Sequence, residues 1–285
     1  RALAFIRLEG ACHRGQNTLM EDEMLLENKT AVIYAAGGAI GGAIARAFAR
    51  EGARLFLTGR TLAKVDAVAK EIVAAGGVAE TAQVDALDQN AVEVHLNTVV
   101  ESAGGVDISF NAIGPGPTPH RIPLTELAGD AFARPIAFYT SSNFITATAA
   151  ARHMTGQGSG VIVTLTAVPG RMPARLIGGA APAWAAVEAF SRSLALELGP
   201  AGIRVVCLRS HAIPETPLIE ANFATAAAAA GVTPAQFQAI LEQGTLLKRL
   251  PTLAEVADAA AFVASDRAGA MTATVVNLSA GSITD

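Results

Sequence analysis

Residues 30–42 read Thr-Ala-Val-Ile-Tyr-Ala-Ala-Gly-Gly-Ala-Ile-Gly-Gly and join a short apolar run to a glycine-rich turn. The run 30–34 is typical of a buried strand, and the alanine-rich amphipathic stretch 43–50 predicts a helix directly after the turn. Such a turn lets backbone N–H groups and the positive helix end face a pyrophosphate, and glycine leaves room for the phosphate. Plain strand-to-helix turns also use glycine, so nucleotide binding and a purely structural role both remain open.

The same alternation of strand and helix continues along the chain. Further strands are expected at residues 54–58, 79–84, 106–111, 160–166, 203–208 and 273–278, and further helices at residues 62–75, 88–103, 137–154 and 183–198. The strands are almost wholly apolar, which is expected when helices cover both faces of a parallel sheet. The sequence therefore predicts a doubly wound α/β fold of Rossmann type, with about seven strands and helices on both faces.

The chain divides into a short extension and one domain. Residues 1–28 are expected to form an N-terminal extension, for which a transit-like segment and a segment upstream of Met20 or Met24 are both open. Residues 29–285 are expected to form a single dinucleotide-binding domain. The stretch 214–250 interrupts the alternation, and we expect it to be a helical lid over the carboxyl edge of the sheet.

Composition excludes several kinds of partner. The 285 residues carry a net charge of −4, which argues against a nucleic-acid partner, and no apolar run approaches the roughly 18 residues of a membrane span. Cys12 and Cys207 cannot form a disulfide framework, and the five histidines lack metal-ligand spacing. We therefore expect a soluble cytoplasmic protein with no metal, membrane or nucleic-acid partner.

The second expected strand ends in Thr58-Gly59-Arg60, about 20 residues after the glycine-rich turn. An acidic residue at this place would bind the ribose 2′-hydroxyl of NAD, whereas an arginine can bind the 2′-phosphate of NADP. Arg60 therefore favours NADP, although NAD remains possible and a solvated surface arginine is the alternative.

Three stretches together resemble the short-chain dehydrogenase/reductase family. They are Gly-Gly-Ala-Ile-Ala-Arg-Ala-Phe-Ala-Arg-Glu-Gly-Ala at 41–53, Val-Glu-Ala-Phe-Ser-Arg-Ser-Leu-Ala-Leu-Glu-Leu-Gly-Pro-Ala-Gly-Ile-Arg-Val at 187–205, and the ending 255–281. The resemblance implies a nicotinamide cofactor, a small-molecule substrate, hydride transfer, and assembly as a homodimer or homotetramer.

The resemblance also assigns cofactor contacts. The family's Gly-x-x-x-Gly-Ile-Gly falls on residues 35–41, where only Gly41 is kept and Ala35 and Ala39 replace the other two glycines. Asp85-Ala86 matches the segment that holds the adenine amino group, and residues 111–114 resemble the family's Asn-Asn-Ala-Gly. The expected cofactor-binding residues are Gly37, Gly38, Ile40, Gly41, Arg60, Asp85, Ala86, Asn111 and Ala112.

The family's four catalytic groups are absent where the resemblance places them. Ala180 matches the catalytic tyrosine and Trp184 the lysine, while Ala167 matches the serine and Tyr139 the asparagine. The chain is thus expected to be a divergent member that lacks the usual tetrad, with an apolar pocket around Ala180 and Ala167 that Trp184 fills.

Three residues are candidates for replacing the missing chemistry. Tyr139 could donate a proton, although its pKa should stay near 10 without a lysine, and Thr166 lies beside the serine position but on the opposite strand face. His211 follows the sixth strand and can act as an acid near pH 7. A packed tyrosine and an exposed or capping histidine are the alternatives, and the loop arginines Arg171 and Arg175 could bind an acidic substrate or face water.

Three functions remain open on this sequence. The first is an NAD(P)-dependent oxidoreductase that acts on a small carbonyl, imine or enone substrate through a non-standard site. The second is a catalytically silent nucleotide-binding pseudoenzyme, and the third is an assembly subunit without nucleotide affinity.

Overall fold

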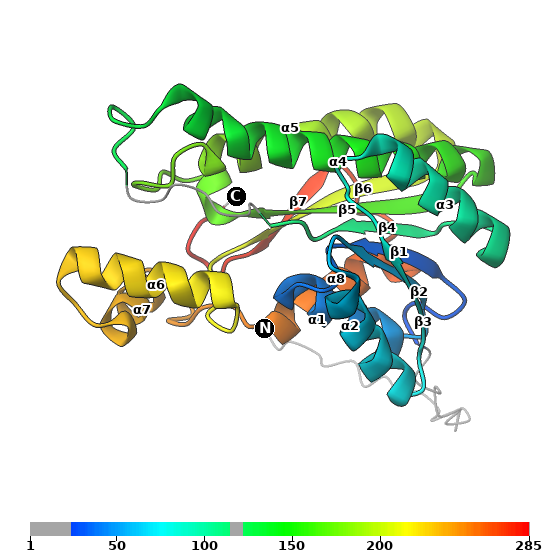
Figure 1. Ribbon diagram of the computed structural model, residues 1–285, viewed down its shortest axis with the longest axis horizontal. Helices are drawn as coiled ribbons and strands as arrows, with labels where there is room; N and C mark the ends of the chain where they lie inside the picture. Colours follow the sequence, from blue (N-terminus) through cyan, green and yellow to red (C-terminus); the bar gives the residue numbers. More distant parts are fainter. Residues whose placement is uncertain (1–23, 115–121, 285) are drawn as a thin grey trace, which may run out of the picture.

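A computed structural model describes residues 24–114 and 122–284 of the chain, and these form a seven-stranded parallel sheet of order β3-β2-β1-β4-β5-β6-β7 (Figure 1). The strands are β1 (Thr30–Tyr34), β2 (Arg54–Gly59), β3 (Val78–Gln83), β4 (Ile108–Asn111), β5 (Gly160–Ala167), β6 (Ile203–Ser210) and β7 (Thr274–Leu278). Helices cover both faces, which confirms the predicted doubly wound α/β fold.

Each face of the sheet has its own apolar core. The principal helices are α1 (Ala39–Arg50), α2 (Leu62–Ala74), α3 (Gln89–Ala103), α4 (Gly129–Gln157), α5 (Ala180–Leu198) and α8 (Leu253–Ala264). Helices α1, α2 and α8 pack on one face, and α3, α4 and α5 pack on the other (Figure 1). Successive side chains of a strand point to opposite faces of the sheet and therefore pack in different cores. Ile33 packs in the core under α1, α2 and α8, and Val32 packs in the core under α3, α4 and α5.

Helix α4 begins earlier than the sequence predicted. It starts at Gly129 rather than near residue 137 and runs through Pro135. Proline lacks a backbone N–H, but Pro135 lies in the second turn of a long helix, where the loss removes a single backbone hydrogen bond. Burial of Pro135 offsets part of that loss, so the helix continues through it.

Two helices occupy the stretch that was expected to be a lid. They are α6 (Pro217–Ala230) and α7 (Pro234–Gln243), and both lie beyond the carboxyl ends of β6 and β7 (Figure 1). Thr233 and Gln236 form a capping box that starts α7. The closing function of these helices and the division into extension and domain stay predictions, and residues 1–23 of the extension lie outside the described residues.

None of the described helices combines the length and apolar character that crossing a bilayer requires. The cytoplasmic location stays a prediction.

The strand order reverses between β1 and β4. The chain moves outward from β1 to β2 and β3 and then returns to place β4 on the other side of β1. In open α/β sheets, the carboxyl ends of the two strands at such a reversal border the crevice where ligands bind. The turn after β1 and the end of β4 therefore border the candidate site.

Candidate active site

The turn between β1 and α1 has the backbone that its glycines permit. A Cβ atom on Gly41 would lie 2.4 Å from the carbonyl oxygen of Ala35, so this position accepts only glycine. Gly38 is the N-cap residue and has no side chain to cap the helix, and the first turn of α1 carries no acidic residue. The first backbone N–H groups of α1 are therefore available to an anion.

Ala35 holds a left-handed backbone conformation in this turn. Its φ is +59°, a region that glycine enters freely and that costs an L-residue roughly 1–2 kcal/mol. The turn thus keeps the shape of a glycine turn although the resemblance places the family's first glycine at this alanine.

The other expected cofactor residues lie along the same edge of the sheet. Arg60 directly follows β2 and is exposed, and Asp85 follows β3, where its Oδ1 accepts a hydrogen bond from the Leu87 N–H at 3.0 Å. Ala86 and Ala112 are buried. The cofactor contacts of the nine residues remain predictions, but the fold brings the carboxyl ends of β1 to β4 together there.

Asn111 at the end of β4 is occupied by bonds within the protein. Its Nδ2 donates to Thr146 Oγ1 of α4 at 3.0 Å, and its Oδ1 accepts from the Ile113 N–H at 3.0 Å. With both side-chain groups bonded, Asn111 fixes the end of β4 against α4.

Tyr139 and Trp184 pack against each other between α4 and α5. Their ring centroids lie 6.0 Å apart, and Ala183 and Val187 complete the apolar cluster around Tyr139, which is only 3% exposed. Burial raises the pKa of Tyr139 above its usual value, and a hydrogen bond from the Trp184 indole lowers it by a smaller amount. The ionised form is therefore disfavoured, and Tyr139 is a poor acid at neutral pH.

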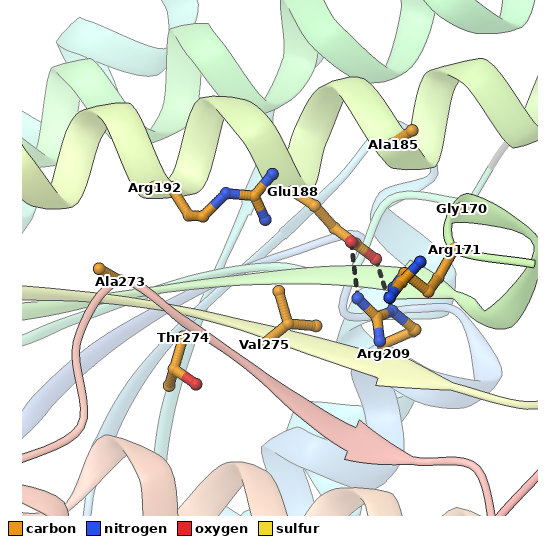
Figure 2. Close-up of a pocket in the computed structure, with 9 residues that line it drawn as sticks. All are labelled: Gly170, Arg171, Ala185, Glu188, Arg192, Arg209, Ala273, Thr274 and Val275. Atoms are coloured by element: carbon orange, nitrogen blue, oxygen red, sulfur yellow. Dashed lines mark hydrogen bonds and ion pairs between the residues drawn. The ribbon is translucent and has the colours of Figure 1, made fainter. Parts of the chain in front are cut away.

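Glu188 and Arg209 form a buried ion pair that connects α5 to β6. Arg209 Nε and one guanidinium nitrogen (Nη2) lie 2.7 Å from the two carboxylate oxygens, and the side chains are only 5% and 3% exposed (Figure 2). Sequence reasoning missed this pair. The signal in the sequence was weak, because Ser191 and Arg192 lie on the same side of α5 as Glu188, one helical turn further along.

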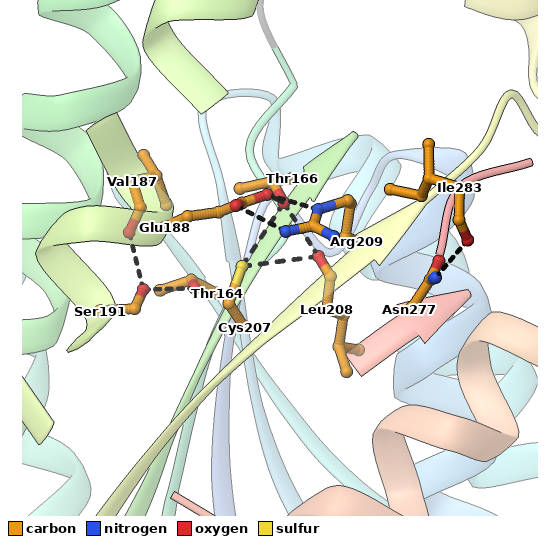
Figure 3. Close-up of polar contacts among 10 residues, drawn as sticks. All are labelled: Thr164, Thr166, Val187, Glu188, Ser191, Cys207, Leu208, Arg209, Asn277 and Ile283. Carbon is orange, nitrogen blue, oxygen red and sulfur yellow. Dashed lines mark hydrogen bonds and ion pairs between the residues drawn. The ribbon is translucent and has the colours of Figure 1, made fainter. Parts of the chain in front are cut away.

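Thr166 belongs to the same buried network. Its hydroxyl donates to Glu188 Oε1 at 3.1 Å and lies 3.4 Å from Cys207 Sγ (Figure 3). Burial raises the pKa of the Cys207 thiol to about 11, which keeps it protonated and unreactive at neutral pH. The hydroxyl of Thr166 thus points toward α5 and is used to support Glu188.

His211 follows β6 at the carboxyl edge of the sheet and is about half-buried. Its Nδ1 accepts a hydrogen bond from the Ala212 N–H at 2.6 Å, so the neutral ring carries its proton on Nε2. Burial lowers the pKa of His211, which favours this neutral form. Of Tyr139, Thr166 and His211, the histidine has the most accessible environment.

The strand order and the glycine-rich turn at its reversal define a dinucleotide-binding domain of Rossmann type. Residues 35–282 match the model of the family described as Enoyl-(Acyl carrier protein) reductase. The chain belongs to this family of short-chain dehydrogenase/reductases, which confirms the resemblance and identifies a protein of oxidoreductase type.

Several curated relatives span nearly the whole chain. An uncharacterized oxidoreductase of Mycobacterium tuberculosis is 29% identical and the match covers 91% of this chain and 94% of the relative. An uncharacterized oxidoreductase of Bacillus subtilis is 30% identical, and the match covers 85% of this chain and 86% of the relative. The 7alpha-hydroxysteroid dehydrogenase of Escherichia coli is 28% identical, with 92% and 97% covered.

Solved structures share the same fold. Levodione reductase superposes with a TM-score of 0.81 at 26% identity and covers 90% of this chain and 97% of its own. NAD+-bound xylitol dehydrogenase superposes with a TM-score of 0.83, covering 90% and 99%, and its 22% identity supports the fold alone. Family members use NAD or NADP as the cofactor.

Proposed function

We propose that this protein is an NADP-dependent oxidoreductase that transfers hydride to or from a small carbonyl, imine or enone through a site without the family's tyrosine and lysine. The observation that carries the proposal is Ala35. The turn keeps its left-handed backbone at an energetic cost, and backbone strain that the surrounding structure enforces is concentrated at active and ligand-binding sites. The oxidoreductase relatives support the same reaction class.

The residues at the carboxyl edge fit a dinucleotide phosphate. The uncapped start of α1 would hold the pyrophosphate. Gly37 and Gly41 allow the turn to pack closely against Lys64 and against the Ala35 backbone, which keeps the turn in this shape. The exposed Arg60 would bind the 2′-phosphate, and Asp85 the adenine amino group. The nicotinamide ring supplies the hydride chemistry when the cofactor is bound.

The proton must come from a group other than Tyr139. The neutral His211 ring presents Nε2–H as a hydrogen-bond donor at the edge where the substrate would lie. The neutral ring polarises a substrate oxygen or nitrogen through this hydrogen bond and keeps its own proton, so the proton that completes the reduction comes from water. This chemistry suits a double bond that is already polarised, such as that of an imine or an enone.

Two titrations test the cofactor assignment. NADPH fluorescence should change on binding to the wild-type protein, and Arg60→Asp should weaken NADPH binding relative to NADH by about tenfold or more because one charge-assisted contact is lost and a repulsive charge is added. Lys70→Asp makes a similar charge reversal at an exposed site further along α2 and serves as the control. An unchanged ratio of the two affinities would contradict the NADP assignment.

Substrate turnover tests the role of His211. Across a panel of ketones, imines and enones, His211→Leu should lower kcat/KM about 100-fold, and His211→Gln should keep part of the activity because an amide N–H can still donate. Tyr139→Phe is the matched control and should retain activity. If NADPH binds but is not oxidised, and no panel member is reduced, the hydride-transfer proposal is wrong and a nucleotide-binding pseudoenzyme is favoured.

We also propose that the protein assembles as a homodimer or homotetramer. Members of the family are commonly oligomeric, and two large side chains on neighbouring helices are exposed here, Phe144 of α4 at 54% and Leu196 of α5 at 80%. Sedimentation equilibrium measures the assembly directly. A monomer at micromolar concentration would contradict this proposal and leave the cofactor proposal intact.

A further inference from the structure

A pocket of about 430 Å³ lies beside the edge strand of the sheet, away from the glycine-rich turn. Residues of α5, β6, β7 and the turn after β5 line it (Figure 2). The glycine-rich turn follows β1, which β4 and β5 separate from β6. The pocket is therefore distinct from the predicted pyrophosphate site.

Three arginines and one carboxylate share this pocket. Arg171, Arg192 and Arg209 contribute three positive charges, and Glu188 contributes one negative charge. The formal charge of the pocket lining is thus +2 in a chain whose net charge is −4. Like charges gathered in one concave site attract an anion more strongly than separate surface charges do.

The carboxylate of Glu188 is already occupied. Both of its oxygens accept hydrogen bonds from Arg209, and Oε1 also accepts from Thr166. Within the described residues, the side chains of Arg171 and Arg192 make no ion pair or hydrogen bond. These two guanidinium groups therefore supply the uncompensated charge.

The two arginines stand on different elements on either side of the buried pair. Figure 2 shows Arg192 on α5 and Arg171 after the end of β5, with Glu188 and Arg209 between them. A planar guanidinium binds a carboxylate or a phosphate through two parallel hydrogen bonds. An acid with two anionic groups can engage both arginines at once.

From this arrangement we propose that the pocket is an accessory anion site for a small dianion, a dicarboxylate or a phosphate-bearing molecule. The dianion binds Arg171 and Arg192, while Glu188 holds Arg209 in the pocket wall. Binding at this site does not depend on the cofactor or on the proposed reaction.

Isothermal titration with glutarate and with inorganic phosphate tests the site. Arg192→Gln and Arg171→Gln should each weaken binding about tenfold, since each removes charge-assisted hydrogen bonds. Both arginines are exposed, Arg171 in a turn and Arg192 on the surface of α5, where glutamine is a good helix former, so the variants should fold. Arg175→Gln is the matched control, because Arg175 is exposed in the same loop and does not line the pocket.

The two probes separate the ligand classes. Tighter binding of glutarate supports a dicarboxylate, and tighter binding of phosphate supports a phosphate-bearing ligand. No heat with either probe at millimolar concentration overturns the proposal, as does equal binding by Arg192→Gln and Arg175→Gln. Sedimentation of the same variants completes the test, because loss of assembly without loss of anion binding would assign the arginines to a subunit interface instead.

Discussion

At the scale of single residues, Ala35 shows what the printed sequence could and could not predict. The resemblance to the family showed that alanine replaces a glycine at this position, but it did not predict the backbone angle there. In the structure the φ angle of Ala35 is +59°, so Ala35 carries the energetic cost of the left-handed backbone in this turn. A backbone angle is set by the strand and helix on either side, so the residue type alone could not predict it.

Ala35→Gly should stabilise the protein. Glycine removes the left-handed strain of roughly 1–2 kcal/mol, while the greater freedom of glycine in the unfolded chain returns part of that gain. The free energy of unfolding should rise by about 0.5–1 kcal/mol in urea denaturation. Ala36→Gly, at a buried residue without positive φ, is the control and should destabilise. A loss of stability in Ala35→Gly would show that Ala35 is not strained.

At the scale of elements, the strands were predictable and the pairing between them was not. The sequence placed all seven strands to within a few residues, because the inner strands are covered on both faces and form apolar runs. Strand β3 differs, since it lies at the edge of the sheet, is partly exposed and contains Glu80 and Gln83. Glu188 and Arg209 are 21 residues apart, and only the packing of α5 on β6 brings them together. Helix α5 also carries Arg192 and Glu197, and β6 also carries Arg204, so the sequence did not indicate which charged residues form a buried pair.

The Glu188–Arg209 pair should behave as a buried ion pair in a double-mutant cycle. Glu188→Leu removes the buried carboxylate that binds the Arg209 guanidinium and should cost about 3–5 kcal/mol of unfolding free energy, and Arg209→Met should cost a similar amount. The double variant Glu188→Leu with Arg209→Met should be more stable than either single variant, because no unpaired charge remains. Urea denaturation of the four proteins measures the coupling.

An exposed ion pair between neighbouring helices provides the comparison for this cycle. Arg152 of α4 and Glu93 of α3 lie 2.6 Å apart, with side chains 54% and 41% exposed. Arg152→Met should cost less than about 1 kcal/mol, because water solvates the remaining carboxylate. Equal costs for breaking the two pairs would contradict the role assigned to burial.

At the scale of the whole molecule, strand order positions the candidate site. The alternation of strands and helices predicted a parallel sheet but carried no information on which strands are neighbours. The return of β4 to the free side of β1 creates the reversal that opens a crevice at the glycine-rich turn. The same order leaves β7 at the edge, where the arginine-lined pocket forms.

Acid stability is a property of the whole molecule that follows from two histidines. His95 of α3 is largely buried, its Nδ1 has no hydrogen-bond partner in the described structure, and burial lowers its pKa to about 4. In the unfolded chain the pKa of histidine is near 6.5. Between these values the unfolded chain binds a proton that the folded chain does not, so unfolding becomes easier as the pH falls.

The free energy of unfolding should therefore be insensitive to His95 above about pH 6.5 and should fall between about pH 6.5 and 4, by up to about 3 kcal/mol. His95→Gln should flatten this fall, as measured by urea denaturation at a series of pH values. Burial lowers the pKa of His211 as well, so part of the slope should remain until His211→Gln is added. Only a group that is protonated differently in the folded and unfolded states makes the free energy of unfolding depend on pH. If His95→Gln leaves the pH dependence unchanged, the folded protein accommodates the charged imidazole of His95 and the prediction is wrong.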